Sequence, residues 1–477
     1  MTVDIAIPSR ARLWAQRGAL TTGTSTVAFA IRFSRTLLLA KMLSPAEFGI
    51  AMALSAVIGA AEVATDTGHD KFALLHEGAA AEQARGALHL LLLVRGAILV
   101  LVLFALAAPL AGLFGVPASV GSFRLVALVP LCRAPMHVDV LQQQRDYRFG
   151  GMALVTMVSQ FGGLAGTVLG ILWLADNRAI LLGFVIESLT RTVCTHAWAS
   201  TAYRLRTDRA MLWAAFRFAL PLMANGVGLA AISQADRLLI GGLFGVETLA
   251  RYSLLLTIAV VPIGLLFSSF GTVSVIALNR VRQNTNRHRH TTVLITWTFA
   301  VLAAGYAFGM ALLLDVSIRL LFGASYAVGP GLQALAALIT LMRVLRGGAP
   351  TAILLNETRT GPLAAGNILL GVGLVAAYAL AHVWPTLEVV LVGVAVGDAL
   401  ALLVLQGWAV RTMPSVRAAM FRSTVAALGA TLLTVAVLLA LPEPAWTSRG
   451  AVLLAGLAGI APACIGLARA WSAREAA

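Results

Sequence analysis

The stretch LLLAKMLSPAEFGIAMAL, residues 37–54, decides the fold, because it joins two apolar runs through a short turn-forming segment. Pro45 fixes its own φ angle and disfavours helix at the residue before it, and Gly49 is expected to relax the backbone. Segment 44–49 therefore predicts the tip of a hairpin of two helices. A similar stretch, LLIGGLFGVETLARYSLLL, occurs at 238–256. Because a similar stretch recurs after about 200 residues, we interpret the chain as two related halves.

The composition is that of a membrane protein. The 477 residues are 59% hydrophobic and 12% charged, with a mean hydropathy of +0.89, whereas a soluble protein carries about twice that charged fraction. Apolar runs of about twenty residues, long enough to cross a bilayer as a helix, recur from end to end. We predict an all-α polytopic membrane protein with about fourteen transmembrane helices. The predicted spans are 18–41, 47–69, 86–112, 119–141, 150–174, 180–202, 213–242, 248–276, 291–317, 330–355, 362–383, 387–410, 418–441 and 450–468.

The basic residues predict the orientation of these spans. Counted over the predicted loops, Arg and Lys favour one side by about five to one, so both termini are expected in the cytoplasm. The formal net charge of +15 has the same origin. The basic residues form no recognisable nucleic-acid-binding module, so no nucleic-acid partner is expected. Lys41 and Lys71 are the only lysines. Such an Arg-rich chain is typical of a GC-rich genome, as in many bacteria.

The repeat predicts the domain organisation. Two lobes of six helices each are followed by two further helices, and each lobe begins on the cytoplasmic side because it has an even number of spans. The repeats are therefore parallel, with a central cavity between them. The predicted segments are 1–17 as an amphipathic cytoplasmic N-terminus, 18–202 and 203–410 as the two lobes, and 411–477 as the last two helices and a cytoplasmic tail.

Three motifs carry a family resemblance: the L-S-P-x-x-F-G tip at 43–49, the DTG at 66–68 and RLLIGGLFGVETLARYS at 237–253. With them the chain resembles the polysaccharide transporters of the multidrug/oligosaccharidyl-lipid/polysaccharide exporter superfamily. The resemblance implies a flippase that moves undecaprenyl-pyrophosphate-linked oligosaccharide repeat units from the cytoplasmic to the periplasmic leaflet, for exopolysaccharide, O-antigen or capsule biosynthesis. It also implies membrane lipids and the polysaccharide polymerase or export machinery as partners.

Arginines inside the predicted spans are the candidates for substrate binding. A charge at the bilayer centre costs about 2.5–3.5 kcal/mol on insertion scales, so such residues usually face a cavity or a partner. Arginine offers two parallel, always-charged donors to phosphate oxygens, which suits a pyrophosphate group. The candidates, all in the first lobe, are Arg32, Arg35, Arg95, Arg133 and Arg191.

The alternative for each arginine is a structural ion pair. Glu62 and Arg95 lie at similar predicted depth on neighbouring helices, and Glu187 lies one turn from Arg191 on the same helix. Arg32 and Arg133 are expected to have no acidic neighbour at their depth. Because either kind of contact satisfies a guanidinium, the pattern alone does not separate ligand binding from pairing.

Carboxylates inside the spans are candidates for ion coupling, because intramembrane Asp and Glu commonly relay protons or cations. We assign this role to Asp66, with His69 one turn away, and to Glu62 and Asp236. The alternative for Asp66 is a charge accommodated at the cytoplasmic interface.

Several motifs of enzymes are missing from the sequence. There is no G-x-x-x-x-G-K-[ST] phosphate-binding loop and no H-E-x-x-H metal motif. No predicted outer loop is long enough for a sugar-handling domain. We therefore expect a transporter rather than an enzyme, without a cofactor or metal. Two alternatives stay open: a multidrug or cation exporter of the same superfamily, and a membrane-embedded glycosyl- or acyltransferase. In the second lobe, Arg343 and Asp398 are predicted to form a structural pair.

Overall fold

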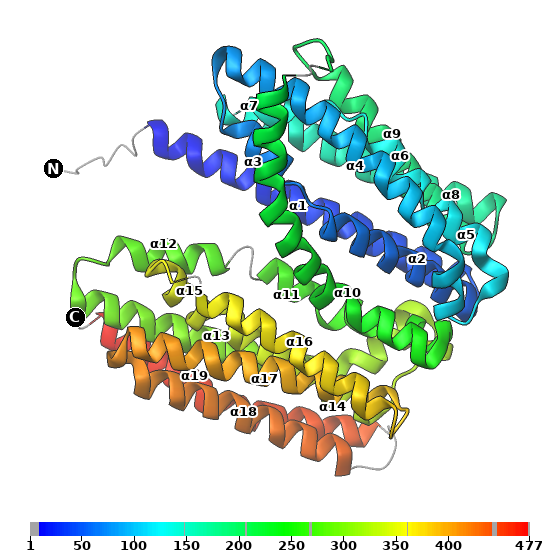
Figure 1. The fold of residues 1–477 in the computed structure, drawn as a ribbon. Coiled ribbons are helices and arrows are strands. Elements are labelled where there is room, and N and C mark those ends of the chain that lie inside the picture. The colour runs from blue at the N-terminus through cyan, green and yellow to red at the C-terminus, as the bar shows by residue number, and fades with distance from the viewer. Residues whose placement is uncertain are drawn as a thin grey trace. The chain divides into compact units, whose positions relative to one another are not determined.

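The computed structural model describes residues 9–146, 148–205, 208–266, 270–359, 361–440 and 446–475 (Figure 1). Every regular element within these ranges is a helix and none is a strand, so the predicted all-α fold is confirmed. The chain divides into two compact units, an N-terminal unit of Met1–Ala250 and a C-terminal unit of Arg251–Ala477. The predicted lobe boundary at 202/203 lies before α10, whereas the boundary between these units lies within it.

The helices that lie wholly in the N-terminal unit range from 5 residues in α7 to 36 in α4, and the 51-residue α10 continues past its boundary. Long helices cross the unit, and short ones connect them. They are α1 (Ser9–Met42), α2 (Pro45–Ala64), α3 (His69–Leu74), α4 (Gly78–Leu113), α5 (Val120–Leu125), α6 (Leu128–Arg133), α7 (Asp139–Gln143), α8 (Gly150–Trp173), α9 (Arg178–Ala197) and most of α10 (Arg209–Ala259).

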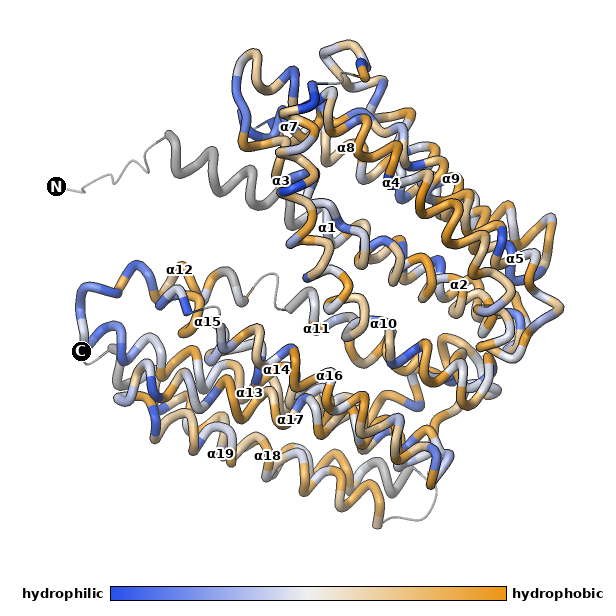
Figure 2. The backbone as a smooth tube through the Cα atoms, viewed as in Figure 1, coloured by the Kyte–Doolittle hydropathy of each residue, from blue (hydrophilic) through white to orange (hydrophobic). Residues whose placement is uncertain are grey.

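The C-terminal unit is built around an alanine-rich core on α13, α14, α18 and α19, where small side chains allow the helices to approach closely. Figure 2 shows hydrophobic residues along its helices and hydrophilic residues in the connection between α12 and α13. The helices after α10 are α11 (Val261–Leu266), α12 (Thr272–Arg280), α13 (Thr285–Phe322), α14 (Pro330–Gly347), α15 (Ala349–Asn356), α16 (Gly361–Ala381), α17 (Leu387–Thr412), α18 (Arg417–Ala440) and α19 (Trp446–Glu475).

Eleven helical segments in the described ranges are long and apolar enough to cross a membrane, which makes the chain a multi-pass membrane protein. The predicted spans 18–41, 119–141 and 180–202 are not among them, so the count of about fourteen is not confirmed. The first and third of these form α1 and α9, whose 34 and 20 residues suffice in length but carry several charges. The prediction of one helix over 119–141 is wrong: the segment is broken into α5, α6 and α7.

The hairpin tip forms as the sequence predicts. The Ser44 hydroxyl caps α2 by accepting a hydrogen bond from the Glu47 backbone N–H at 3.3 Å, and Pro45 takes the first helical position. Glu47 then ties the tip to α9, because its carboxylate accepts hydrogen bonds from the backbone and the side-chain amide of Asn177, both at 2.7 Å.

Glycines bring the two copies of the repeated motif together within the N-terminal unit. A Cβ atom on Gly49 would lie 2.0 Å from the backbone oxygen of Val246. Val246 follows Gly245, whose φ of 80° and ψ of 175° break α10 and turn the chain in the second copy. Gly49 is therefore required by close packing, and the expectation that it relaxes the backbone is wrong. Gly226 brings α10 equally close to the end of α2, since its Cβ would lie 2.3 Å from the Val63 oxygen.

We predict that Gly49→Ala lowers the apparent melting temperature of the detergent-solubilised protein. The added methyl group must push two backbones apart, an overpacking cost of about 1–3 kcal/mol. The matched control is Gly112→Ala, a helical glycine with open space around it, where alanine should be neutral or stabilising. Equal melting temperatures for the two variants would contradict the contact between the motifs.

Candidate functional site

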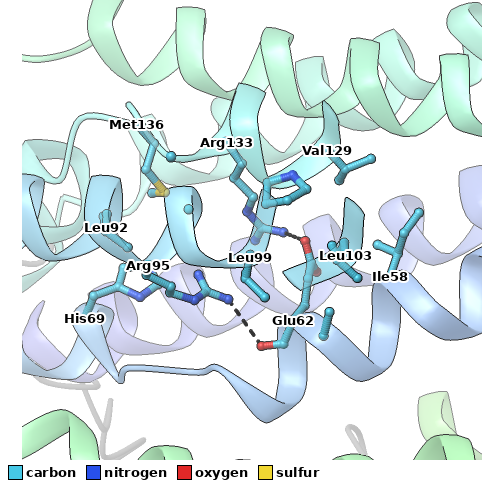
Figure 3. Close-up of a pocket in the computed structure, with 14 residues that line it drawn as sticks. Ile58, Glu62, His69, Leu92, Arg95, Leu99, Leu103, Val129, Arg133 and Met136 are labelled. Atoms are coloured by element: carbon cyan, nitrogen blue, oxygen red, sulfur yellow. Dashed lines mark hydrogen bonds and ion pairs between the residues drawn. The ribbon is translucent and has the colours of Figure 1, made fainter. Parts of the chain in front are cut away.

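A cavity in the N-terminal unit contains three of the residues that sequence analysis assigned to function, Glu62, Arg95 and Arg133 (Figure 3). Its volume is about 30 Å³, comparable to the space of one water molecule in the liquid. Helices α2, α4 and α6 supply most of its wall. The lining residues are Ile58, Ala61, Glu62, His69, Leu92, Arg95, Gly96, Leu99, Leu103, Val129, Pro130, Arg133, Ala134 and Met136.

Close packing of α4 against the end of α6 brings the two arginines to one cavity. A Cβ on Gly96 would lie 2.4 Å from the Cβ of Ala134, so only glycine allows this approach. Gly96 directly follows Arg95, and Ala134 directly follows Arg133. The contact therefore positions both guanidinium groups opposite α2.

Glu62 is bound to both arginines, but in two different ways. Its carboxylate forms an ion pair with Arg133, as Figure 3 shows. Its backbone oxygen accepts a hydrogen bond from Arg95 at 3.3 Å, and Arg95 also donates to the Thr65 hydroxyl at 2.9 and 3.1 Å. The expectation that Arg133 has no acidic neighbour is thus wrong. The alternative of an ion pair between Glu62 and Arg95 is also wrong, because only the backbone of Glu62 contacts Arg95.

Arg35 occupies a separate, buried position. It is 4% exposed, it forms an ion pair with Glu187 at 2.5 Å, and it donates to the Thr167 hydroxyl at 3.1 Å. Gly163 on α8 and Gly183 on α9 make room for the guanidinium, because a Cβ on either would lie within 3 Å of it. Arg35 is therefore held as a structural group and does not line the cavity.

The predicted pair of Glu187 and Arg191 is also wrong. Glu187 binds Arg35 and accepts a hydrogen bond from Gln160 at 2.6 Å. The half-buried Arg191 lies within electrostatic range of Arg133, Glu187, Glu62 and Arg32. Within the described part of the chain, neither Arg191 nor the exposed Arg32 forms an ion pair.

The candidate ion-coupling residues lie in two places. Asp66 follows the end of α2, where one donor atom from each of Asp66, His69 and Asp70 lies within 4.8 Å of the others, so these residues could hold a cation. Burial, followed by the charge of Arg95, lowers the pKa of His69 to about 4. The ring is therefore neutral near pH 7 and offers a lone pair. Asp236 lies on α10, is 9% exposed, and accepts a hydrogen bond from the Arg237 backbone at 2.8 Å; it does not line the cavity.

Two further polar groups were missed by sequence analysis. Thr65 lies three residues after Glu62, which puts both on one face of a helix, and this spacing was the available signal. Asp139 is 4% exposed, pairs with Arg85 at 2.7 Å, and accepts hydrogen bonds from Thr201 and the Ser200 backbone at 2.9 and 2.8 Å. Asp139 thus fixes the loop after α9 against α4 and α7.

In the C-terminal unit, the predicted pair of Arg343 and Asp398 is confirmed at 2.9 Å. Asp398 is fully buried, and Arg346 lies 3.5 Å from its other carboxylate oxygen. The charge of this buried carboxylate is compensated by two guanidinium groups within the unit, although its Oδ1 accepts no hydrogen bond from the described residues, so we interpret the cluster as structural.

Comparisons with known proteins identify the family and the fold of the chain. A family model described as polysaccharide biosynthesis protein matches residues 38–328. The succinoglycan biosynthesis transport protein ExoT of Rhizobium meliloti (strain 1021) is 25% identical over 321 residues, which are 64% of this chain and 61% of that protein. The chain therefore spans less than two thirds of the length of this relative.

Solved structures show the same fold. The lipid II flippase MurJ, in an inward closed conformation, matches with a TM-score of 0.64 over 93% of this chain and 96% of its own, at 14% identity. An inward-facing multidrug resistance MATE family transporter of the MOP superfamily matches with a TM-score of 0.54 over 83% and 95%, also at 14% identity. The predicted fold of this superfamily is thus confirmed.

We predict that Arg35→Ala destabilises the protein strongly, because it leaves the Glu187 carboxylate buried without a cation, a cost of about 3–5 kcal/mol. Arg32→Ala, one turn earlier on α1, is the control and should leave the apparent melting temperature nearly unchanged. The double variant Arg35→Met with Glu187→Leu should recover part of the loss. If the Arg35→Ala and Arg32→Ala variants have the same apparent melting temperature, the pair of Arg35 with Glu187 is not structural.

Proposed function

The chain belongs to the polysaccharide biosynthesis protein family, and from this we propose that it is a flippase for lipid-linked oligosaccharides. Its substrate is an undecaprenyl-pyrophosphate-linked repeat unit, which it moves from the cytoplasmic to the periplasmic leaflet of a bacterial inner membrane. The transport role named for the succinoglycan relative and the flippase role named for MurJ support this proposal. In this proposal the chain acts as a transporter and not as an enzyme.

The observation that carries the proposal is the excess of positive charge around the cavity. Arg95, Arg133 and Arg191 interact with Glu62, and Arg95 also interacts with Asp66, so three cations face two carboxylates. The nearby Glu187 is already neutralised by Arg35. An excess of guanidinium groups inside a membrane protein needs an anion, and a pyrophosphate supplies one. A multidrug exporter for cations would need the opposite excess.

In the proposed mechanism, Arg95 and Arg133 bind the pyrophosphate, and Arg191 and Arg32 extend the cationic surface. Leu92, Leu99 and Leu103 give the cavity an apolar wall. Once the substrate fills the cavity and displaces its water, this wall strengthens the contacts with the pyrophosphate. The polyprenyl chain stays in the bilayer. A cavity of about 30 Å³ does not admit a pyrophosphate, so the cavity must open to bind it, as alternating access requires.

The orientation follows from the basic loops. Both termini lie in the cytoplasm, because the arginine-rich connections stay on that side. The cavity then receives substrate from the cytoplasmic leaflet. The flipped unit is passed to a polymerase or export machinery at the periplasmic side.

We predict that Arg133→Ala and Arg95→Ala each slow the transfer of lipid-linked oligosaccharide across reconstituted liposomes by about tenfold or more, because each removes a charge-assisted contact worth about 1.5–3 kcal/mol. The assay measures the accessibility of the sugar to an external lectin or glycosidase. Arg148→Ala, an exposed arginine in the connection before α8, is the control and should transfer at the wild-type rate. Wild-type rates for both cavity variants would refute the proposed site.

Ion coupling is assigned to the cluster of Asp66, His69 and Asp70, with Asp236 as a second candidate. We predict that an imposed proton or sodium gradient accelerates transfer by the wild type and that Asp66→Asn removes this acceleration while the gradient-free rate persists. Glu77→Gln, an exposed carboxylate before α4, should keep the acceleration. A gradient response that survives Asp66→Asn would exclude this cluster; Asp236→Asn would then be tested in the same assay.

A further inference from the structure

Glu62 differs from the other acidic partners of intramembrane arginines in how it is held. In the pair of Glu62 with Arg133, the side chains are 39% and 37% exposed, whereas in the pair of Glu187 with Arg35 they are 17% and 5% exposed. An ion pair this exposed contributes little to stability. The Glu62 carboxylate can therefore leave Arg133 at small cost.

The backbone of Glu62 is fixed independently of its side chain. Near the end of α2, the N–H groups of Thr65 and Asp66 bond to the oxygens of Ala61 and Val63, and Arg95 donates to the oxygen of Glu62. A terminal carbonyl of the helix is thus satisfied by the neighbouring arginine. If the side chain of Glu62 turns away, this anchor stays in place and the cavity keeps its shape.

The carboxylate occupies the position that a phosphate would need. A carboxylate oxygen and a phosphate oxygen bind a guanidinium with the same charge-assisted geometry. Among the described residues, the Arg133 guanidinium is bound by one group, the carboxylate of Glu62. A pyrophosphate that binds Arg133 must therefore displace Glu62.

We propose that Glu62 is a resident counter-anion of the binding site, which the pyrophosphate of the substrate replaces on Arg133, and that the displaced carboxylate takes up a proton from the cytoplasmic side. This inference rests on the proposed function and adds its regulation. A pyrophosphate diester carries two negative charges, so an ionised Glu62 left beside it would be repelled, and protonation removes that repulsion. Release of the substrate returns Glu62 to Arg133 and frees the proton.

The groups facing Glu62 agree with this exchange. They are Arg95 on α4, Arg133 on α6 and Arg191 on α9, with His69 at the start of α3 lining the same cavity. While the site is free of substrate, these arginines face the Glu62 carboxylate and attract it. Once a dianion binds them, that attraction is lost. His69 stays neutral near pH 7 and does not compete for the proton.

The test is the affinity of the purified protein for a farnesyl-diphospho-sugar, a diester probe whose two charges do not titrate between pH 5.5 and 8. We expect wild-type affinity to rise as the pH falls, by up to about tenfold per pH unit where one proton is taken up. Glu62→Gln, which has the shape of the wild-type residue but no charge, should bind about five- to tenfold more tightly at pH 8 and show no pH dependence. Glu77→Gln is the control, because Glu77 is an exposed carboxylate before α4 and does not line the cavity; this variant should keep the wild-type pH profile.

Weaker binding by Glu62→Gln, or a pH dependence equal to that of the wild type, would overturn the exchange. Arg133→Ala separates this failure from failure of the proposed function. If Arg133→Ala lowers the affinity while Glu62→Gln keeps the wild-type pH profile, the pyrophosphate site stands and only the exchange is wrong. If Arg133→Ala binds the probe as the wild type does, the proposed site itself is wrong.

Discussion

A guanidinium group inside a membrane must find an anion, and the N-terminal unit depends on how each of its arginines meets this requirement. Arg35 has a permanent partner: Glu187, Thr167 and two glycines enclose it completely. Arg133 has an exchangeable partner, because more than a third of each side chain in its pair with Glu62 is exposed. Burial therefore decides which ion pair holds helices together and which one can give way to a ligand.

Close backbone contacts support this division of roles. The tip of the first hairpin packs against its repeat at Gly49 and Val246, and Gly226 brings α10 against the end of α2. Helix α2 is thus held at both ends by α10. Because α2 is fixed in this way, Glu62 faces the cavity from a rigid element, and only its side chain needs to move. A preorganised site of this kind avoids much of the ordering cost of binding.

The sequence predicted the all-α membrane fold and the hairpin tip, because hydropathy and proline act locally. It did not predict the partners. The prediction of one helix over 119–141 placed Arg133 at the wrong depth; the breaks around α6 bring it to Glu62. Glu187 was paired with Arg191, one turn away on the same helix. Gly163 on α8 and Gly183 on α9 leave the space that the Arg35 guanidinium occupies. This space results from tertiary packing, so the spacing of residues along α9 does not predict it.

The two units satisfy their charges differently, and this difference favours the N-terminal cavity as the anion site. In the C-terminal unit, Asp398 is fully buried between Arg343 and Arg346, so its removal would strand two cations and its side chain has no exposed route away from them. In the N-terminal unit, Arg191 and Arg32 add positive charge beside a carboxylate that is 39% exposed. A mobile anion among fixed cations is a poor structural device, since it contributes little stability. A carboxylate of this kind is instead suited to act as a temporary counter-ion. It compensates positive charge of the arginines inside the membrane until the anionic ligand binds them.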